Sequence, residues 1–170
     1  MPLRLPPSLL SAALILLVAM PTRATANEDA APPEALRTEF VYEAIVEIGA
    51  TVEVGDTPEG HRRYIPITGG TLKGERLRGE VLPGGADWQI ERRDGVTEVD
   101  ALYSMRCEDG TVIIVRNRGV IAEQGRYLRT ALRFEVPDGP HAWLARSQFV
   151  GSIAGGPRPG TVTIRVFRVL

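Results

Sequence analysis

The chain has 170 residues, of which 20 are Lys or Arg and 21 are Asp or Glu, so its formal charge at pH 7 is −1. This balance excludes a strongly basic surface of the kind that binds nucleic acid through its phosphates. The length is sufficient for one domain with a real hydrophobic core.

Residues 1–26 have the pattern of a signal peptide. Arg4 makes the start positive, an apolar stretch extends from Leu9 to Met20, and Ala24-Thr25-Ala26 is an A-x-A cleavage sequence. The apolar stretch is shorter than the roughly 20 residues that cross a bilayer, and an uncleaved membrane anchor is the alternative. We therefore expect a periplasmic or secreted protein with no membrane contact after cleavage. With no twin-arginine motif the chain would fold after export, so no cytoplasmically loaded cofactor is expected.

A polar, proline-containing linker is expected over 27–36, and a single domain over 37–170. From Phe40 to Ile48 every second residue is apolar, with Glu43 and Glu47 between them, as in a half-buried strand. Further strand patterns occur at 50–54, 61–68, 73–82, 86–92, 97–107, 111–121, 129–136, 147–154 and 161–169. A short helix is expected only over 141–146.

Asp94-Gly95 and Asp109-Gly110 predict tight hairpins, because both central residues of such turns adopt positive φ. Eight to ten short strands joined by hairpins indicate an all-β fold, either a single antiparallel β-barrel or a sandwich. Glycines inside the strands, such as Gly79 and Gly119, favour the barrel, whose strands must bend sharply. A barrel of about eight strands holds packed side chains or one small ligand.

Two glycine pairs stand out, Gly69-Gly70 and Gly84-Gly85, each next to an apolar stretch. Such pairs mark sharp turns or places where the backbone packs too closely for a Cβ atom. The second pair leads directly to Asp87 and Trp88. Asp87 either caps the turn or faces a ligand. Trp88 either belongs to the core or lines a pocket.

Strand periodicity assigns other polar residues to the barrel interior. Tyr103 alternates with apolar neighbours and is expected inside, whereas Asp100 is expected outside, where it can pair with an arginine. Asn117 shares a face with two β-branched residues, and Thr130 shares one with Phe134. The candidate ligand-binding residues are Asp87, Trp88, Tyr103, Asn117 and Thr130.

Several collinear motifs resemble those of one small bacterial family, catalogued as domain of unknown function 3237. They are Gly60 to Gly70, Val81 to Trp88, Asp100 to Tyr103, Asp109-Gly110, Asn117-Arg118-Gly119, Tyr127 to Thr130, Phe134-Glu135 and Trp143-Leu144. The resemblance covers about residues 37–169. It implies a compact antiparallel barrel similar to lipocalin-like and allene-oxide-cyclase-like barrels, and it implies no established activity. Cys107 stands where the family has a threonine, which argues against a thiol function.

The sequence gives no recognisable metal or cofactor motif. Cys107 is the only cysteine, so no internal disulfide can form, and a buried inert thiol is the simplest interpretation. His61 and His141 both lie beside turn signals, without the three or four ligands at suggestive spacing that a zinc site needs. We therefore predict no metal and no cofactor.

Three functions follow from this pattern. The first is binding of a small, largely apolar or aromatic ligand inside the barrel. The second is a cofactor-independent cyclase, isomerase or lyase with Asp87 as base and Tyr103 as acid. The third is a structural or interaction protein with a filled barrel, forming a homodimer through the final strand, Val162 to Val169.

Overall fold

The computed structural model describes residues 35–170, so the predicted signal peptide and residues 27–34 of the predicted linker lie outside the described residues. The described part contains ten strands and two short 3-10 helices. In chain order they are β1 (Thr38–Ile48), β2 (Val52–Thr57), β3 (Gly60–Lys73), β4 (Arg78–Val81), β5 (Gly85–Glu91), β6 (Thr97–Cys107), β7 (Val112–Ala122), η1 (Glu123–Gly125), β8 (Tyr127–Glu135), η2 (Ala142–Arg146), β9 (Phe149–Gly155) and β10 (Thr161–Val169).

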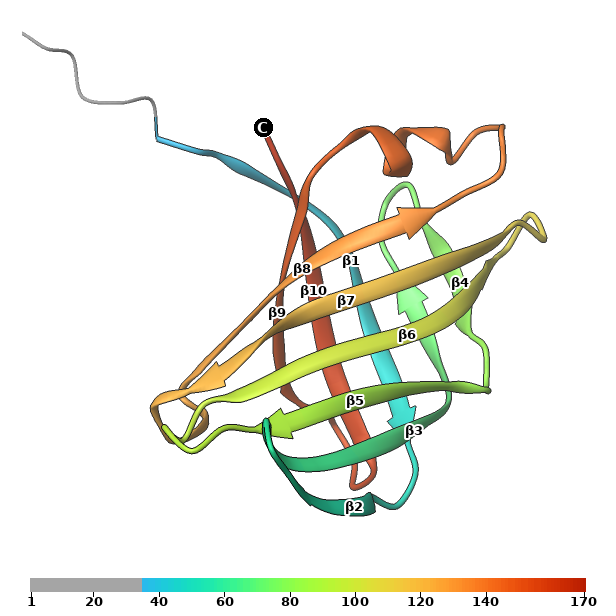
Figure 1. Ribbon diagram of the computed structural model, residues 1–170. Helices are drawn as coiled ribbons and strands as arrows, with labels where there is room; N and C mark the ends of the chain where they lie inside the picture. Colours follow the sequence, from blue (N-terminus) through green and yellow to red (C-terminus); the bar gives the residue numbers. More distant parts are fainter. Residues whose placement is uncertain (1–34) are drawn as a thin grey trace, which may run out of the picture. The chain divides into compact units, whose positions relative to one another are not determined.

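All the strands belong to one antiparallel sheet that closes on itself (Figure 1). Strand β1 closes it by pairing with β10 on one side and with the second half of β3 on the other. Strand β2 continues beyond β1 along the first half of β3, and β4 and β5 both lie between β3 and β6. The result is a closed eight-strand barrel with two extra strands, which confirms the predicted architecture.

Strand β6 shows why the sequence adopts this fold. Its alternate residues from Thr97 to Cys107 are buried, and the residues between them are exposed or half-buried. This is the two-residue period of a strand with one face in a core. Hairpins are present on either side of β6, as the two Asp-Gly pairs predicted, with Gly95 at φ 81° and Gly110 at φ 86°. The prediction that both central residues adopt positive φ was wrong, because in each pair only the glycine does.

The two glycine pairs have different structural roles. Gly69-Gly70 lies within β3 rather than at its end, so the sequence-based division into strands 61–68 and 73–82 was wrong. A Cβ at Gly70 would collide with the Ile45 backbone on β1, which shows that this pair permits close strand packing. Gly84, with φ 107°, lies in the turn before β5. A Cβ on Gly85 would lie 2.5 Å from the Cβ of Tyr103.

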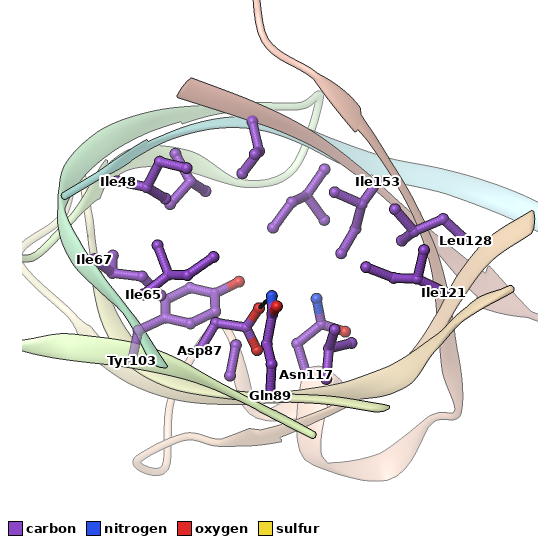
Figure 2. A pocket seen from close by; sticks show the side chains of 15 residues that line it. Ile48, Ile65, Ile67, Asp87, Gln89, Tyr103, Asn117, Ile121, Leu128 and Ile153 are labelled. Carbon is purple, nitrogen blue, oxygen red and sulfur yellow. Dashed lines mark hydrogen bonds between the residues drawn. The ribbon is translucent and has the colours of Figure 1, made fainter. Parts of the chain in front are cut away.

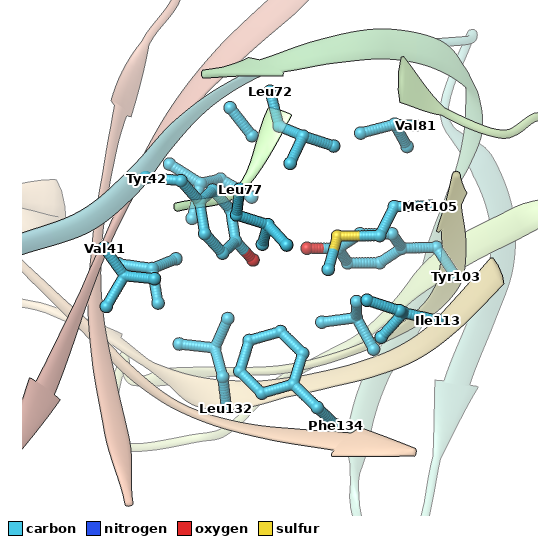
Figure 3. Close-up of a cluster of buried hydrophobic side chains, with 14 of the residues drawn as sticks. Val41, Tyr42, Leu72, Leu77, Val81, Tyr103, Met105, Ile113, Leu132 and Phe134 are labelled. Atoms are coloured by element: carbon cyan, nitrogen blue, oxygen red, sulfur yellow. The ribbon is translucent and has the colours of Figure 1, made fainter. Parts of the chain in front are cut away.

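One half of the barrel is filled by the hydrophobic core (Figure 3). Tyr42, Met105 and Phe134 project into it from three strands, and Leu77 comes from the β3–β4 connection. Leu144 of η2 adds to this core and is 1% exposed. The short helix expected over 141–146 is thus present as η2, and it covers this end of the barrel.

The final strand has no free edge, because β10 pairs with β1 on one side and β9 on the other. The prediction that this strand offers a dimer edge was therefore wrong. Sequence periodicity identifies the faces of a strand but does not show which strands close the barrel. Among residues 35–170, no helix is long and apolar enough to span a membrane.

Candidate functional site

The half of the barrel away from η2 encloses a cavity of about 150 Å³ (Figure 2). We call it the barrel cavity. Its lining consists of Val46, Ile48, Ile65, Ile67, Asp87, Gln89, Val99, Ala101, Tyr103, Asn117, Ile121, Leu128, Ile153, Val162 and Ile164. Most of these side chains are aliphatic, so the barrel cavity is an apolar space with a few polar groups, the usual composition of a small-molecule site.

The aliphatic side chains differ in depth. Val46, Ile67 and Ile164 are at most 5% exposed and form the floor of the barrel cavity. Ile121, Leu128 and Ile153 are half-buried and lie near the β7–β8 and β9–β10 connections. An apolar ligand entering from this end would therefore contact aliphatic side chains along its whole path.

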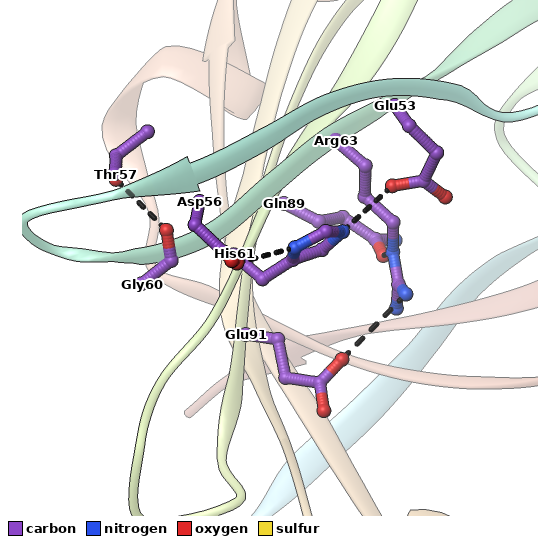
Figure 4. Close-up of polar contacts among 8 residues, drawn as sticks. All are labelled: Glu53, Asp56, Thr57, Gly60, His61, Arg63, Gln89 and Glu91. Carbon is purple, nitrogen blue, oxygen red and sulfur yellow. Dashed lines mark hydrogen bonds and ion pairs between the residues drawn. The ribbon is translucent and has the colours of Figure 1, made fainter.

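The polar groups of the barrel cavity form a hydrogen-bonded chain that begins at Arg63. Its Nε donates to Gln89 Oε1 at 3.0 Å, and Gln89 Nε2 donates to Asp87 Oδ2 at 2.6 Å. The second carboxylate oxygen of Asp87 accepts the backbone N–H of Asp100 at 3.1 Å. Arg63 is also paired with Glu91, with 3.7 Å between Nη1 and Oε2 (Figure 4). These bonds fix the orientation of the Asp87 carboxylate.

Burial raises the pKa of Asp87 above its ordinary value of 3.8, because a charged carboxylate loses its hydration there. The bonds from Gln89 and from the Asp100 N–H oppose this effect by stabilising the charged form, and so does the charge of Arg63. Burial is the largest of these influences. The carboxyl group thus holds a proton more readily than a solvated one.

Two other polar groups of the barrel cavity have no hydrogen-bond partner within the described residues. They are the Tyr103 hydroxyl and Asn117 Oδ1, and both are buried. Burial also raises the pKa of Tyr103 well above its ordinary value, so the phenol keeps its proton. The Tyr42 and Tyr103 hydroxyls point toward each other and are close enough to influence each other's pKa, although neither has a partner with full hydrogen-bond geometry (Figure 3). Unpaired buried polar atoms are rare in native proteins and call for an explanation such as a ligand or water.

The structure brings three of the five predicted site residues together around the barrel cavity, namely Asp87, Tyr103 and Asn117. Thr130 is also buried, at 5% exposure, but lies opposite Gly151 and does not line the barrel cavity. The prediction that Trp88 faces the interior was wrong. Trp88 is 45% exposed on the outer surface, because it follows Asp87 on a regular strand and must point the other way.

On the outer surface Trp88 packs against Tyr64, with 4.6 Å between ring centroids. The neighbouring Asp100 is outside, as predicted, and accepts hydrogen bonds from Arg116 at 2.8 and 2.9 Å and from Arg118 at 2.9 Å. The bonds from Arg116 contribute most to lowering the pKa of Asp100, which falls to about 2. This outer surface holds an ion-pair network and open hollows of about 520 Å³, each lined by Trp88 and Asp100 together with Arg62.

Sequence reasoning missed Gln89 and Arg63. The sequence nevertheless contained the signal. Gln89 lies two residues after Asp87, and Arg63 lies two residues before Ile65. Residues two apart share a face of a strand, so both belong to strand faces that point into the barrel. It also missed a group at the other end of the barrel, where Cys107, Asp109 and His141 come close enough to bind one metal ion.

The fold and the barrel cavity define the chain as a closed antiparallel β-barrel protein with an internal, mainly apolar pocket. The chain belongs to the family described as "Protein of unknown function (DUF3237)", whose model matches residues 36–169. It is 36% identical over 135 residues to a UPF0311 protein of Rhodopseudomonas palustris, an alignment that covers 70% of this chain and 88% of that protein. The resemblance identified from the sequence motifs is thus confirmed.

Solved structures share the fold. The conserved protein RPA1785 from Rhodopseudomonas palustris has a TM-score of 0.74 at 36% identity, covering 81% of this chain and 100% of that one. A beta-barrel like protein from Acinetobacter baumannii has a TM-score of 0.73 at 29% identity, and the match covers 82% of this chain and 99% of that one. A protein from Penicillium herquei described as an enzyme has a TM-score of 0.70 at 20% identity, and the match covers 83% of this chain and 99% of that one. At this identity the likeness shows the fold alone.

Proposed function

We propose that this protein binds one small, largely apolar molecule inside the barrel cavity. The observation that carries the proposal is a pair of buried polar atoms, Tyr103 Oη and Asn117 Oδ1, that have no partner with full hydrogen-bond geometry in a mainly aliphatic space. A buried polar atom left without a partner costs about 1–3 kcal/mol. A ligand with a matching polar group recovers that cost when it binds, while its apolar part leaves water.

The composition of the barrel cavity restricts the ligand further. An apolar cavity of about 150 Å³ accommodates a molecule the size of benzene, so one ring or a short branched chain fits inside. The carboxyl group in the lining of the barrel cavity is that of Asp87, which disfavours an anionic ligand. The Tyr103 hydroxyl can donate and the Asn117 amide oxygen can accept, so a neutral alcohol, phenol, ketone or amide matches these groups.

The predicted export signal adds a compartment to this proposal. With residues 1–26 removed, the chain would bind its ligand in the periplasm or outside the cell. Mass spectrometry of protein recovered from the periplasm tests both points. A mature mass starting at Asn27 is the expected result, and retention of residues 1–26 would contradict export with cleavage.

Native mass spectrometry of gently purified protein tests binding. An adduct of about 100 daltons, the mass of one ring or a short branched chain with a polar group, is expected to disappear on denaturation. Tyr103→Phe should reduce its occupancy because only the hydroxyl is removed. Tyr64→Phe is the matched control, since Tyr64 packs on Trp88 at the outer surface. A bare mass that stays bare when alcohols, phenols and ketones are added would refute the binding proposal.

Catalysis without a cofactor is the second candidate, favoured by the raised pKa of Asp87 in the same cavity as the protonated Tyr103. In such a reaction Asp87 would take a proton from the substrate and Tyr103 would give one to it, as in an isomerisation. Asp87→Asn should then abolish turnover of a bound compound while its affinity changes little. Unchanged turnover in both Asp87→Asn and Tyr103→Phe would exclude this mechanism. The third candidate, a structural or interaction protein with a filled barrel, has less support because part of the interior is unfilled.

A further inference from the structure

Three metal-ligating side chains meet at the end of the barrel opposite the barrel cavity. Cys107 ends β6, Asp109 lies in the β6–β7 turn, and His141 immediately precedes η2 (Figure 1). One ligand atom from each lies within 4.8 Å of the other two. His141 Nε2 and Asp109 Oδ2 are 2.9 Å apart. The histidine comes 32 residues after the aspartate, so the fold rather than local sequence assembles this group.

The backbone holds two of these ligands in place before any metal binds. The Cys107 N–H donates to the Thr111 carbonyl at 2.9 Å, and the Gly110 N–H donates to the Cys107 carbonyl at 2.9 Å. Asp109 Oδ1 accepts the Thr111 N–H at 3.0 Å, which leaves Oδ2 directed at His141. The Glu108 N–H also donates to the backbone carbonyl of Arg78 on β4 at 3.0 Å. A turn fixed in this way loses little conformational freedom on binding.

The surroundings suit a cation despite two nearby arginines. The three ligands lie in a cleft of about 280 Å³ that also includes Glu75 and Glu108. The Arg76 guanidinium lies over the ring of Trp143, 4.2 Å from its centroid. Arg78 donates from Nε to the Gly74 carbonyl at 3.1 Å. These contacts orient both guanidinium groups, and the carboxylates of Glu75, Glu108 and Asp109 outnumber them in the cleft.

The distances are close to those of a tetrahedral site. Zinc bonds of 2.0–2.3 Å place neighbouring ligand atoms about 3.3–3.8 Å apart. In this structure His141 Nε2 is 2.9 Å from Asp109 Oδ2, and Cys107 Sγ is at most 4.8 Å from each of these two ligands. Small side-chain rotations bring all three separations into the range for zinc. Thiolate, imidazole and carboxylate together match zinc and similar divalent ions better than Mg²⁺ or Ca²⁺, which prefer oxygen ligands alone.

We infer that Cys107, Asp109 and His141 form a binding site for one divalent transition-metal ion of the Zn²⁺ type, with the fourth coordination position open to the cleft. Binding converts the Cys107 thiol to a thiolate and releases its proton to solvent. The metal links the β6–β7 turn to the segment that begins η2, the element that covers the filled half of the barrel. This site is separate from the barrel cavity and does not depend on the proposed ligand.

Titration of the purified, metal-free protein with Co²⁺ tests the inference, because Co²⁺ replaces Zn²⁺ and reports its ligands by absorption. We expect saturation at one equivalent, visible bands of a tetrahedral ion and a near-ultraviolet thiolate-to-cobalt charge-transfer band, all reversed by Zn²⁺. Cys107→Ser should abolish the charge-transfer band. Loss of a side chain that only supports a metal ligand weakens metal affinity by about 10- to 100-fold. Asp109→Asn and His141→Ala remove ligands themselves, so each should weaken Co²⁺ affinity by more than that.

His61→Ala is the matched control. The ring of His61 also contacts two carboxylates, Glu53 at 2.9 Å and Asp56 at 2.8 Å, but no thiol (Figure 4). This variant should bind Co²⁺ as the unaltered protein does. Zn²⁺ should also raise the melting temperature of the unaltered protein, because it binds only the folded state. That shift should be absent in His141→Ala.

Two results would overturn the site. One is the absence of saturable Co²⁺ binding to the metal-free protein. The other is binding that is lost in His61→Ala but kept in His141→Ala. If circular dichroism shows that Cys107→Ser does not fold, Asp109→Asn still decides the outcome, because the Asp109 side chain is 43% exposed and lies in a turn. His141→Ala adds a second test, since His141 lies in the connection before η2 and not in a strand of the core.

Discussion

The Gln89 side chain donates a 2.6 Å hydrogen bond to the Asp87 carboxylate, and both residues project from β5 into the barrel cavity. Since Gln89 also accepts a bond from Arg63, the buried carboxylate is connected through one amide to a guanidinium group. This arrangement fixes the direction of Asp87 and partly offsets the cost of burying its charge. A carboxylate held in this way is oriented before any ligand arrives.

The raised pKa of Asp87 predicts a pH dependence of stability. The folded protein binds a proton at a pH where the unfolded chain, with a pKa near 3.8, has lost it. Stability therefore falls as pH rises from about 3.8 to the higher folded-state pKa. Asp87→Asn removes this titration. The melting temperature of the variant minus that of the unaltered protein should therefore rise between pH 3.8 and the folded-state pKa of Asp87, and should stay constant above it. Thermal unfolding from about pH 3 to about pH 7 measures this; a difference independent of pH would contradict it.

Tyr103→Phe should have opposite effects on stability and binding. The Tyr103 hydroxyl is buried without a partner, and such a group costs about 1–3 kcal/mol. Its removal should leave the free energy of unfolding of the ligand-free protein unchanged or raise it by about 1 kcal/mol. Affinity for a ligand that accepts a hydrogen bond should fall by about tenfold, equivalent to ~1.4 kcal/mol. Urea denaturation and calorimetric titration measure the two quantities, and a loss of both stability and affinity would indicate a structural role only.

Period-two alternation explains which site residues could be predicted from the sequence. Tyr103, Asn117 and Thr130 share strand faces with apolar residues, and all three are buried. The same rule forbids adjacent Asp87 and Trp88 from facing the same side, and giving priority to the aromatic character of Trp88 over its strand position led to the wrong placement. Burial preference is a weaker guide than strand position for a residue as large as tryptophan.

Long-range assembly explains what could not be predicted. Cys107 and His141 are separated by the whole of β7 and β8, and they meet only because η2 folds back over the barrel end. Likewise, Gly69-Gly70 was placed between two predicted strands, 61–68 and 73–82, although it lies inside β3 and lets β1 and β3 approach each other. No local pattern shows which two strands will be neighbours in a closed sheet.

Asp100 should show the opposite pH dependence to Asp87. The bonds from Arg116 and Arg118 lower the pKa of Asp100 from 3.8 to about 2, so its stabilising effect is complete above pH 3.8 and is lost as pH falls to about 2. Asp100→Asn should lower the free energy of unfolding at neutral pH by about 0.5–1 kcal/mol, the upper range for surface ion pairs. Thermal unfolding should show this deficit vanishing in acid. A deficit that persists to pH 2 would assign Asp100 a role independent of its charge.

Gly85→Ala should be strongly destabilising, because the new Cβ would lie 2.5 Å from Tyr103 Cβ and 2.6 Å from the Leu102 carbonyl oxygen. Overpacking of this kind costs about 1–3 kcal/mol. Gly155→Ala is the matched control, since nothing lies within 4 Å of its added Cβ, and it should change stability by less than about 0.5 kcal/mol. Urea denaturation measures both. The substitution at Gly85 should also reduce ligand occupancy, because relief of the clash must move Tyr103 within the barrel cavity. Equal stability of the two variants would show that β5 can shift freely, and the close approach of β5 to β6 would then not determine the position of Tyr103.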